Sequence, residues 1–519
     1  MSGGTILSDF EMLKAHLLEI LRAHEGMRVF SPRDTDGKMQ EHVLLPKAAL
    51  KLLDSAEDYR KKGPEAFVKL VELVEKMDNY EMMVSGRVLQ EILVQAGLAE
   101  AHHRLRTFNK SVSQEVQEIS NNEDSSVVSF KGTFEKLVQK GCSPKQIREA
   151  IVSQKIELVL TAHPTEAQRR SALKKHEEML TQMKVHDGKN QLTPGQLVEL
   201  NEKVKAIQWS CWRTNTVRRT RPTPEGEARN GMLVIEDTVW RAVPEHYRRL
   251  DRCLRRIGAD GLPMNCSILK MSSWMGGDRD GNPNVTWHVT KQVVTLLRWR
   301  IVELYYREVD ELLYELSMAG EVNQEMKDEV ERVSSMWTAT SAPGQKVCRP
   351  DARSGVHWNF HTGVAADEPY RRLLMAIRRR CWRTKATMES MYLGKQSDPD
   401  FEKEVLTSSE ELCRPLEIMY RSLIENGDEI VANGRLLDLI RRVRTFGISM
   451  ACLDVRQESD RHAEVLDTLT DFLGLGKFTE WPEEKKCEWL VKEIESNRPL
   501  LSPDMPMSDI VKEIIETYK

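Results

Sequence analysis

The run LVLTAHPTEAQRR at residues 158–170 decides the fold, because it joins a short apolar segment to a polar, amphipathic one. Residues 156–161 are mainly apolar and β-branched and are bounded by a turn, which is typical of a short buried strand. Pro164 disfavours helical backbone angles at the residue before it, so His163 is expected in extended conformation. The run therefore predicts a strand that ends just before a histidine.

A helix is predicted directly after this turn. Thr165 is the expected N-cap, Gln168 completes a capping box, and the helix is expected to extend from residue 166 to about residue 184. The beginning of a helix carries partial positive charge and unpaired N–H groups, so it attracts anions. A histidine there can exchange protons near neutral pH, which makes His163 a candidate catalytic residue.

The neighbours of His163 decide between a functional and a structural interpretation, because a lone histidine is equally often a hydrogen-bonded core residue. Arg169 and Arg170 follow on the predicted helix, and guanidinium groups bind phosphate and carboxylate in a forked geometry. Charged helix faces are usually only solvated, so each arginine alone is weak evidence. Together with His163 the two arginines favour an anion site.

Composition excludes several classes of protein. The 519 residues exceed one simple core and predict two to four domains at about 150 residues each. A net charge of −4 gives no general attraction to nucleic acid or acidic membranes. No apolar run approaches the roughly 18 residues of a membrane span, and the N-terminus lacks a signal-peptide pattern. Nine scattered cysteines without a Cys-x-x-Cys pair favour reduced thiols and a cytoplasmic location over a zinc site.

Helical apolar spacing dominates the chain, and the polar residues 109–129 are predicted to form a flexible connector. A second strand is expected at Phe446 to Val455, with a helix from about Ser459, and residues 339–369 are expected to form a loop. The predicted helices cover residues 8–24, 46–108, 130–153, 166–184, 193–219, 286–318, 369–393 and 409–444.

This pattern predicts a mainly α protein with an α/β part, a (β/α)8 TIM-type barrel embedded in many additional helices. Residues 1–153 are the predicted N-terminal helical region, and residues 154–519 the first part of the barrel with helical insertions. Only two strand–turn–helix junctions are evident where a closed barrel needs eight strands, so the barrel is predicted to be incomplete in this chain.

The second motif is SSWMGGDRDGNP at residues 272–283, in which glycines allow close approach of a ligand and Trp274 supplies an apolar wall. A calcium loop counted from Asp278 needs glycine at position six and glutamate at position twelve, where Pro283 and Val289 stand. The structural alternative is a tight hairpin or a loop held by aspartate side chains.

The third motif is LDVRQESDRH at residues 453–462, where polar residues crowd the end of the predicted strand. Barrel enzymes keep their sites at the carboxyl ends of strands, and Arg456 is a candidate to bind phosphate. A salt-bridged strand end without function is an equally good interpretation of this pattern alone.

The three motifs together resemble those of the phosphoenolpyruvate carboxylase family. The blocks RRTRPTPEGEAR (218–229), EPYRRLL (368–374) and YRSLIENGDEIVANGRLLDLIRRVRTFG (420–447) extend the resemblance. It implies a carbon–carbon lyase that joins bicarbonate to phosphoenolpyruvate and gives oxaloacetate and phosphate, feeding the tricarboxylic acid cycle. It also implies Mg²⁺, with Mn²⁺ as the alternative, and a homotetramer.

The resemblance also implies roles for individual residues. Bicarbonate attacks the phosphate to give carboxyphosphate and an enolate, and the carboxyphosphate releases CO₂ for the enolate to capture. His163 matches the essential histidine, which accepts the proton of carboxyphosphate or positions its carboxyl group. Arg456 matches a phosphate-binding arginine, and Trp274 matches a pocket wall that excludes water. A basic region for sugar-phosphate activation is implied at Arg169, Arg170, Arg218 and Arg219.

The family is considerably longer than this chain, which is therefore predicted to be a fragment with doubtful activity of its own. No metal ligand is assigned within it, and the acidic ligands are expected beyond residue 519. The alternative functions are a non-catalytic helical scaffold or regulatory subunit that pairs with a catalytic homologue, and an anion-sensing module. Phosphoenolpyruvate and bicarbonate are the expected partners, with no nucleic acid and no membrane.

Overall fold

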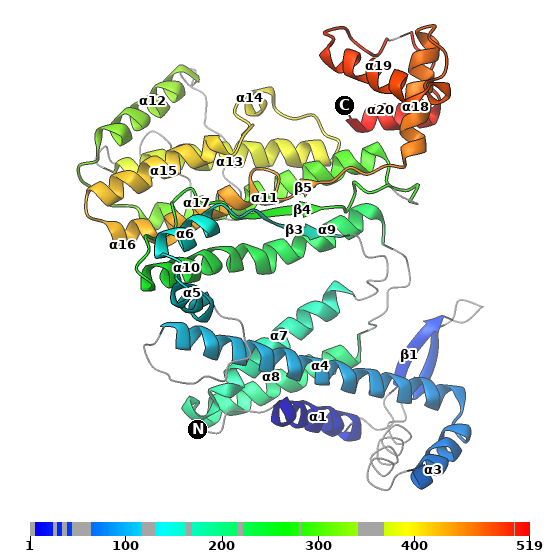
Figure 1. Cartoon of the computed structure of the whole chain (residues 1–519). Coiled ribbons are helices and arrows are strands. Elements are labelled where there is room, and N and C mark those ends of the chain that lie inside the picture. The colour runs from blue at the N-terminus through cyan, green and yellow to red at the C-terminus, as the bar shows by residue number, and fades with distance from the viewer. Residues whose placement is uncertain are drawn as a thin grey trace. The chain divides into compact units, whose positions relative to one another are not determined.

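The computed structural model describes residues 6–23, 28–33, 39–43, 64–116, 130–161, 169–214, 222–279, 282–340, 368–502 and 504–518 (Figure 1). The chain divides into two compact units. Unit 1 comprises Met1–Ser129 with Thr165–Arg221, and unit 2 comprises Phe130–Pro164 with Pro222–Lys519. The units thus alternate along the chain, whereas the predicted domains are two consecutive segments.

Unit 1 is a helical bundle with a small antiparallel hairpin. Its helices are α1 (Ile6–Ala23), α3 (Pro64–Glu75), α4 (Asn79–Val116), α7 (Arg170–Asp187) and α8 (Pro194–Trp212), with the short η1 (Lys189–Gln191) between α7 and α8; the hairpin pairs β1 (Arg28–Arg33) with β2 (Met39–Val43). Apolar side chains of three helices form its core: Leu13, Met179, Met183, Leu200, Val204, Ile207 and Cys211. Helix α7 joins unit 1 because Met179 and Met183 are buried in this core.

The local sequence explains where helix α8 begins. The Thr193 side chain accepts a hydrogen bond from the Gln196 backbone N–H, the Gln196 side chain accepts one from the Thr193 backbone N–H, and Pro194 occupies the first turn. The helix ends at Trp212, earlier than the predicted residue 219, and residues 215–221 lie outside the described residues. The connector predicted at 109–129 overlaps the helical end of α4, and residues 117–129 are also not described.

A polar cluster, buried at Asp9 and His102 and exposed at Asp187, ties α1, α4 and α7 together. His102 Nδ1 lies 3.0 Å from Asp9 Oδ2, and His102 Nε2 lies 3.3 Å from Asp187 Oδ2. Arg106 Nη2 donates to Asp9 Oδ2 at 3.0 Å and to Asp187 Oδ1 at 2.6 Å. These four residues, the unit-1 cluster, pair with one another where the three helices meet.

Unit 2 contains a parallel sheet surrounded by helices. The helices before the long α11 (Trp287–Glu315) are α5 (Phe130–Gln139), α6 (Pro144–Val152), α9 (Pro224–Val234), η2 (Ile235–Val239) and α10 (Trp240–Arg256). Those after it are α12 (Gln324–Thr340), α13 (Pro369–Tyr392), α14 (Pro399–Glu402), α15 (Glu410–Glu425), α16 (Glu429–Val431), η3 (Ala432–Leu436), α17 (Leu437–Phe446), α18 (Ser459–Phe472), η4 (Phe478–Glu480), α19 (Glu483–Glu495) and α20 (Asp509–Tyr518). The helices predicted at 286–318 and 369–393 are confirmed as α11 and α13.

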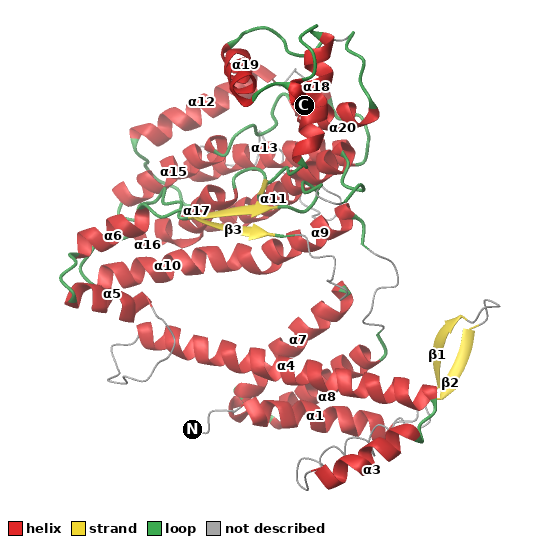
Figure 2. Cartoon of the chain, turned by 45° about the vertical axis from the view of Figure 1, so that its right-hand side comes forward, coloured by secondary structure: helices red, strands yellow, loops and turns green. Residues whose placement is uncertain are grey.

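The sheet has the order β3 (Ile156–Leu160), β4 (Leu269–Ser273) and β5 (Cys452–Leu453), and all three strands are parallel. Ile156 pairs with Leu269, and Leu160 pairs with Ser273. The strands lie among α9, α10, α11 and α17 in both views (Figures 1 and 2). The strand predicted at 156–161 is confirmed as β3, but the prediction that it is buried is wrong, because its residues 156–159 are exposed and Leu160 is only partly covered. Strand β4 is an additional central strand.

The prediction of a long strand from Phe446 to Val455 is wrong. Phe446 ends α17, the chain turns through Gly447 at φ 58° and Met450 at φ 62°, and only Cys452 and Leu453 form a strand. Phe446, Met450 and Ala451 are apolar because they are buried in the core, not because they alternate along a strand. The helix predicted at 409–444 is likewise interrupted between α15 and α16, where Gly427 has φ 84°.

The described part of the chain is therefore mainly helical with one small parallel sheet, which agrees with the coarse fold class. None of the described helices is long and apolar enough to cross a membrane.

Candidate functional site

The carboxyl ends of the three parallel strands meet at one edge of the sheet. The Trp274 backbone N–H donates to the Leu160 carbonyl at 2.9 Å, and the Asp454 N–H donates to the Ser273 carbonyl at 2.9 Å. The residues that directly follow β3, β4 and β5 are thus neighbours. In open parallel sheets ligands bind outside the carboxyl ends of the strands, so a site is expected here.

The chain beyond β4 and the chain beyond β5 continue to pair past the strands. The Arg456 N–H donates to the Gly277 carbonyl at 3.0 Å, and the Arg279 N–H donates to the Arg456 carbonyl at 3.1 Å. Asp278 and Arg456 form an isolated parallel bridge. The second and third sequence motifs are therefore one structural unit, in which the glycine loop fixes the backbone that carries Arg456.

Two glycines make this pairing sterically feasible. A Cβ atom at Gly277 would lie 2.2 Å from the Asp454 carbonyl oxygen, which is backbone and cannot move aside. Gly276 has φ 82°, a left-handed conformation, and a Cβ there would lie 2.6 Å from Val293. The two glycines thus let the loop pack closely on the Asp454 backbone and on the Val293 side chain.

Trp274, Asp454 and Arg456 form the strand-end cluster. Trp274 Nε1 donates to Asp454 Oδ2 at 3.1 Å, and the Arg456 guanidinium carbon lies 3.6 Å from the centre of the Trp274 ring. Arg456 Nη2 is 3.8 Å from Asp454 Oδ2, and the side chains of Arg456 and Asp454 are 46% and 42% exposed. The guanidinium lies over an indole while remaining partly open to solvent, an arrangement suited to binding phosphate or carboxylate.

Arg279 joins the loop that contains Gly276 and Gly277 to helices α11 and α20. Its Nη1 donates to the Gly277 carbonyl at 3.0 Å, and its Nη2 donates to Thr290 of α11 at 2.7 Å and to Thr517 of α20 at 3.0 Å. Its Nε lies 3.9 Å from Glu513, and burial lowers the pKa of Arg279 despite that carboxylate. Sequence reasoning missed this role, since only the tertiary structure brings α11 and α20 to the loop.

The structure brings together two of the predicted site residues, Trp274 and Arg456. His163 lies outside the described residues, as do Thr165, Arg218 and Arg219. Arg169 and Arg170 are exposed at the beginning of α7 in unit 1. The prediction that this helix begins at residue 166 with Thr165 as its N-cap is wrong, because α7 begins at Arg170 and its N-cap is the extended Arg169, which makes no side-chain capping bond. Asp454 was not singled out from the sequence, although a carboxylate two residues before an arginine at a strand end was a usable signal.

The described residues at the strand ends do not form a metal site. The group with metal-ligand spacing within the described ranges is Asp9, His102 and Asp187, in unit 1. There Arg106 donates to both carboxylates, and a cation would have to displace it. At the strand ends Asp454 is engaged by Trp274 and Arg456, so these residues do not fit Mg²⁺ or Mn²⁺.

The chain matches the family model described as phosphoenolpyruvate carboxylase over residues 8–519. It is 36% identical over 476 residues to the C4 phosphoenolpyruvate carboxylase of Flaveria trinervia, covering 90% of this chain and 47% of that protein. The housekeeping isozyme of phosphoenolpyruvate carboxylase from Glycine max is 37% identical over 473 residues, covering 89% of this chain and 47% of the relative. Phosphoenolpyruvate carboxylase 2 of Sorghum bicolor is 40% identical over 381 residues, covering 72% and 38%. The chain thus spans about half the length of the first two of these relatives, and less of the third.

Proposed function

The chain belongs to the phosphoenolpyruvate carboxylase family, and we propose that it carries half of the active site that joins bicarbonate to phosphoenolpyruvate. The products are oxaloacetate and phosphate, which makes the reaction a carbon–carbon lyase reaction run in the carboxylating direction and a supply of the tricarboxylic acid cycle. The observation that carries the proposal is the Arg456 guanidinium stacked 3.6 Å from the Trp274 ring at the strand ends.

The proposed fold is an incomplete (β/α)8 barrel. Three adjacent parallel strands whose polar residues gather at their carboxyl ends support it, because barrels of this class keep their sites at that end. The remaining strands are expected in the part of the relatives' length that this chain does not span. The cytoplasm is the expected location and a homotetramer the expected assembly.

Arg456 is proposed to bind the phosphate of phosphoenolpyruvate. Its half-exposed guanidinium keeps donors toward solvent while its face rests on Trp274, so little side-chain entropy is lost when a phosphate binds. Trp274 is proposed to wall off the reacting carbon, where an apolar surface protects the enolate from protonation by water.

His163 is proposed as the catalytic residue that takes the proton from carboxyphosphate or positions its carboxyl group. In the sequence it follows Leu160 by three residues, and the Leu160 carbonyl at the end of β3 accepts the Trp274 N–H at 2.9 Å. Imidazole exchanges protons near neutral pH, as this role requires.

Mg²⁺, with Mn²⁺ as the alternative, accompanies the proposed reaction. Its acidic ligands are proposed to lie in the part of the relatives' length that this chain does not span. Arg169, Arg170, Arg218 and Arg219 are proposed to bind an anionic effector, which their guanidinium chemistry supports.

The test is bicarbonate- and Mg²⁺-dependent formation of oxaloacetate from phosphoenolpyruvate by purified residues 1–519, coupled to NADH oxidation. His163→Asn is the matched variant, because asparagine keeps a polar side chain of similar size but exchanges no proton. If the chain is active, we expect this variant to lose about 100-fold or more, the usual contribution of a positioned proton-transfer group.

Each outcome has a defined meaning. Activity lost in His163→Asn supports the proposed mechanism and shows that this chain suffices. Activity unchanged by His163→Asn would refute the role of the histidine. A folded but inactive chain that still binds phosphoenolpyruvate supports a retained half-site, whereas a folded chain that does not bind it favours the non-catalytic scaffold.

A further inference from the structure

A small pocket in unit 2 lies among helices α12, α13 and α15, and none of the strand-end residues lines it. Its cavity volume is about 70 Å³. That is roughly half of an engineered cavity of about 150 Å³ that binds benzene. The pocket therefore suits a molecule of only a few heavy atoms.

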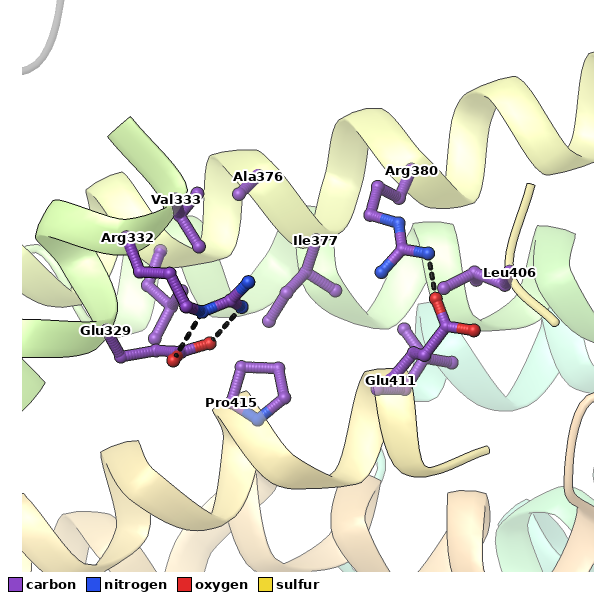
Figure 3. Close-up of a pocket in the computed structure, with 11 residues that line it drawn as sticks. Glu329, Arg332, Val333, Ala376, Ile377, Arg380, Leu406, Glu411 and Pro415 are labelled. Atoms are coloured by element: carbon purple, nitrogen blue, oxygen red, sulfur yellow. Dashed lines mark hydrogen bonds and ion pairs between the residues drawn. The ribbon is translucent and has the colours of Figure 1, made fainter. Parts of the chain in front are cut away.

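The walls of the pocket are apolar in the middle and charged at both ends. Figure 3 shows Ile377 from α13 and Pro415 from α15 facing each other across it. Glu329 and Arg332 of α12 lie at one end, and Arg380 of α13 meets Glu411 of α15 at the other (Figure 3). A pocket with apolar walls and a few convergent polar groups is the usual form of a small-molecule site.

The two carboxylates of the pocket are already saturated with donors. Glu329 is 3% exposed, accepts two hydrogen bonds from Arg332 and lies 3.5 Å from Arg414. Glu411 accepts from the Thr407 backbone at 3.0 Å, from the Thr407 hydroxyl, from the Ser408 backbone at 3.2 Å and from Arg380. A cationic ligand would therefore have to displace existing bonds.

Arg380 keeps one donor for a ligand. Its Nη2 donates to Glu411 and its Nε to the Glu404 carbonyl at 3.4 Å. Among the residues that the structure describes, no acceptor lies within hydrogen-bond distance of Nη1. Figure 3 shows this guanidinium directed toward the middle of the pocket.

We propose that this pocket binds a small aliphatic monocarboxylate, whose oxygen accepts from Arg380 Nη1 and whose hydrocarbon chain packs on Ile377 and Pro415. A carboxylate matches the donor of a guanidinium, and the short apolar walls match a chain of one to three carbons. This site among α12, α13 and α15 is separate from the strand-end cluster and takes no part in the proposed reaction.

The test is titration of residues 1–519 with acetate, propionate and butyrate, followed by saturation-transfer NMR. We expect millimolar binding that strengthens about fourfold for each added methylene until the pocket is full. Arg380→Gln removes the charged donor, and Ala376→Val narrows the pocket without changing a charge. Each is expected to weaken binding about tenfold or more.

Arg383→Gln is the matched control, because Arg383 lies one turn further along α13 and pairs with Glu404 outside the pocket. It should leave binding unchanged, and phosphoenolpyruvate should not displace bound propionate. Thermal melting checks that each variant folds, and either pocket variant decides the question if the other fails to fold. No carboxylate binding, unchanged binding in a folded pocket variant, or equal binding of propylammonium would overturn the proposal.

Discussion

The unit-1 cluster and the strand-end cluster contain the same kinds of side chain and are organised in opposite ways. In the unit-1 cluster, Arg106 is 10% exposed and divides its hydrogen bonds between Asp9 and Asp187. In the strand-end cluster, Arg456 is 46% exposed, rests on an indole and is 3.8 Å from its single carboxylate. Arg106 donates its hydrogen bonds to carboxylates of the protein, whereas Arg456 keeps N–H donors that a ligand can use.

The comparison shows how to tell a structural ion cluster from a binding site. The number of arginine donors already bonded within the protein separates the two better than the types of residue do. Hydrogen bonds to Asp187 and then Asp9 raise the pKa of Arg106 despite its burial, so its charge is committed to holding three helices. Breaking a buried pair costs stability, whereas removing an exposed arginine costs mainly ligand binding. The two clusters should therefore respond to substitution in different measurements.

The largest expected effect is on stability, from Arg106→Ala. It leaves Asp9 and Asp187 with His102 but without the arginine that bonds both carboxylates, and we expect the free energy of unfolding to fall by about 3 kcal/mol. Denaturant unfolding measures this change. The matched control is Arg104→Ala on the same helix, where the arginine is 77% exposed and pairs with Glu100, and it should cost well under 1 kcal/mol. Equal losses in the two variants would break the comparison.

The next effect is on binding, from Arg456→Ala. We expect the affinity of residues 1–519 for phosphoenolpyruvate to fall about 10- to 100-fold, with little change in melting temperature, because the side chain is half exposed. Calorimetric titration measures the affinity. The affinity of Arg456→Lys should lie between those of Arg456→Ala and the unsubstituted chain, since lysine keeps the charge but loses the forked, stacked geometry.

Arg461→Ala is the matched control for Arg456, because Arg461 is 43% exposed and lies 3.9 Å from Glu458. It should leave phosphoenolpyruvate affinity unchanged. A loss of stability in Arg456→Ala without a loss of affinity would place the strand-end cluster in the same structural class as the unit-1 cluster.

The smallest expected effect is on the melting temperature at low pH, from Glu157→Gln. Glu157 is an exposed residue of β3, so it extends the comparison to an exposed ion pair. Hydrogen bonds from Ser272 and then Lys270 lower the pKa of Glu157. Its contribution to stability is therefore complete above the ordinary glutamate pKa of about 4 and is lost as the pH falls through the lower folded value. Glu157→Gln should reduce the dependence of the melting temperature on pH below about pH 4.

Glu149→Gln is the control, because Glu149 is an exposed partner of Lys145 at 3.9 Å and belongs to no strand. Its melting temperature should follow that of the unsubstituted chain across the same pH range. Identical pH profiles for Glu157→Gln and the unsubstituted chain would show that this pair contributes nothing to the sheet.

Much of the fold was predictable because apolar periodicity is a local property. The strand at β3 and the long helices α11 and α13 were predicted within a few residues of their observed ends. Strand β4 was not predicted, although Leu269 and Met271 face the core while Lys270 faces outward, an alternation that a five-residue strand shows only weakly. The region after Phe446 was mistaken for a strand because burial and strand formation select the same apolar residues.

The sequence by itself determined the short β3 strand, the principal helices and the two motifs that carry Trp274 and Arg456. Turns, helix caps and apolar periodicity depend on residues that are close in the sequence, so they can be predicted without knowledge of the fold. Only the tertiary structure decided that β4 lies between β3 and β5, that Gly277 admits the Asp454 carbonyl, and that residues 9, 102 and 187 meet in one cluster. These contacts depend on which apolar faces bury one another, a choice made by the whole chain and recorded in no single segment.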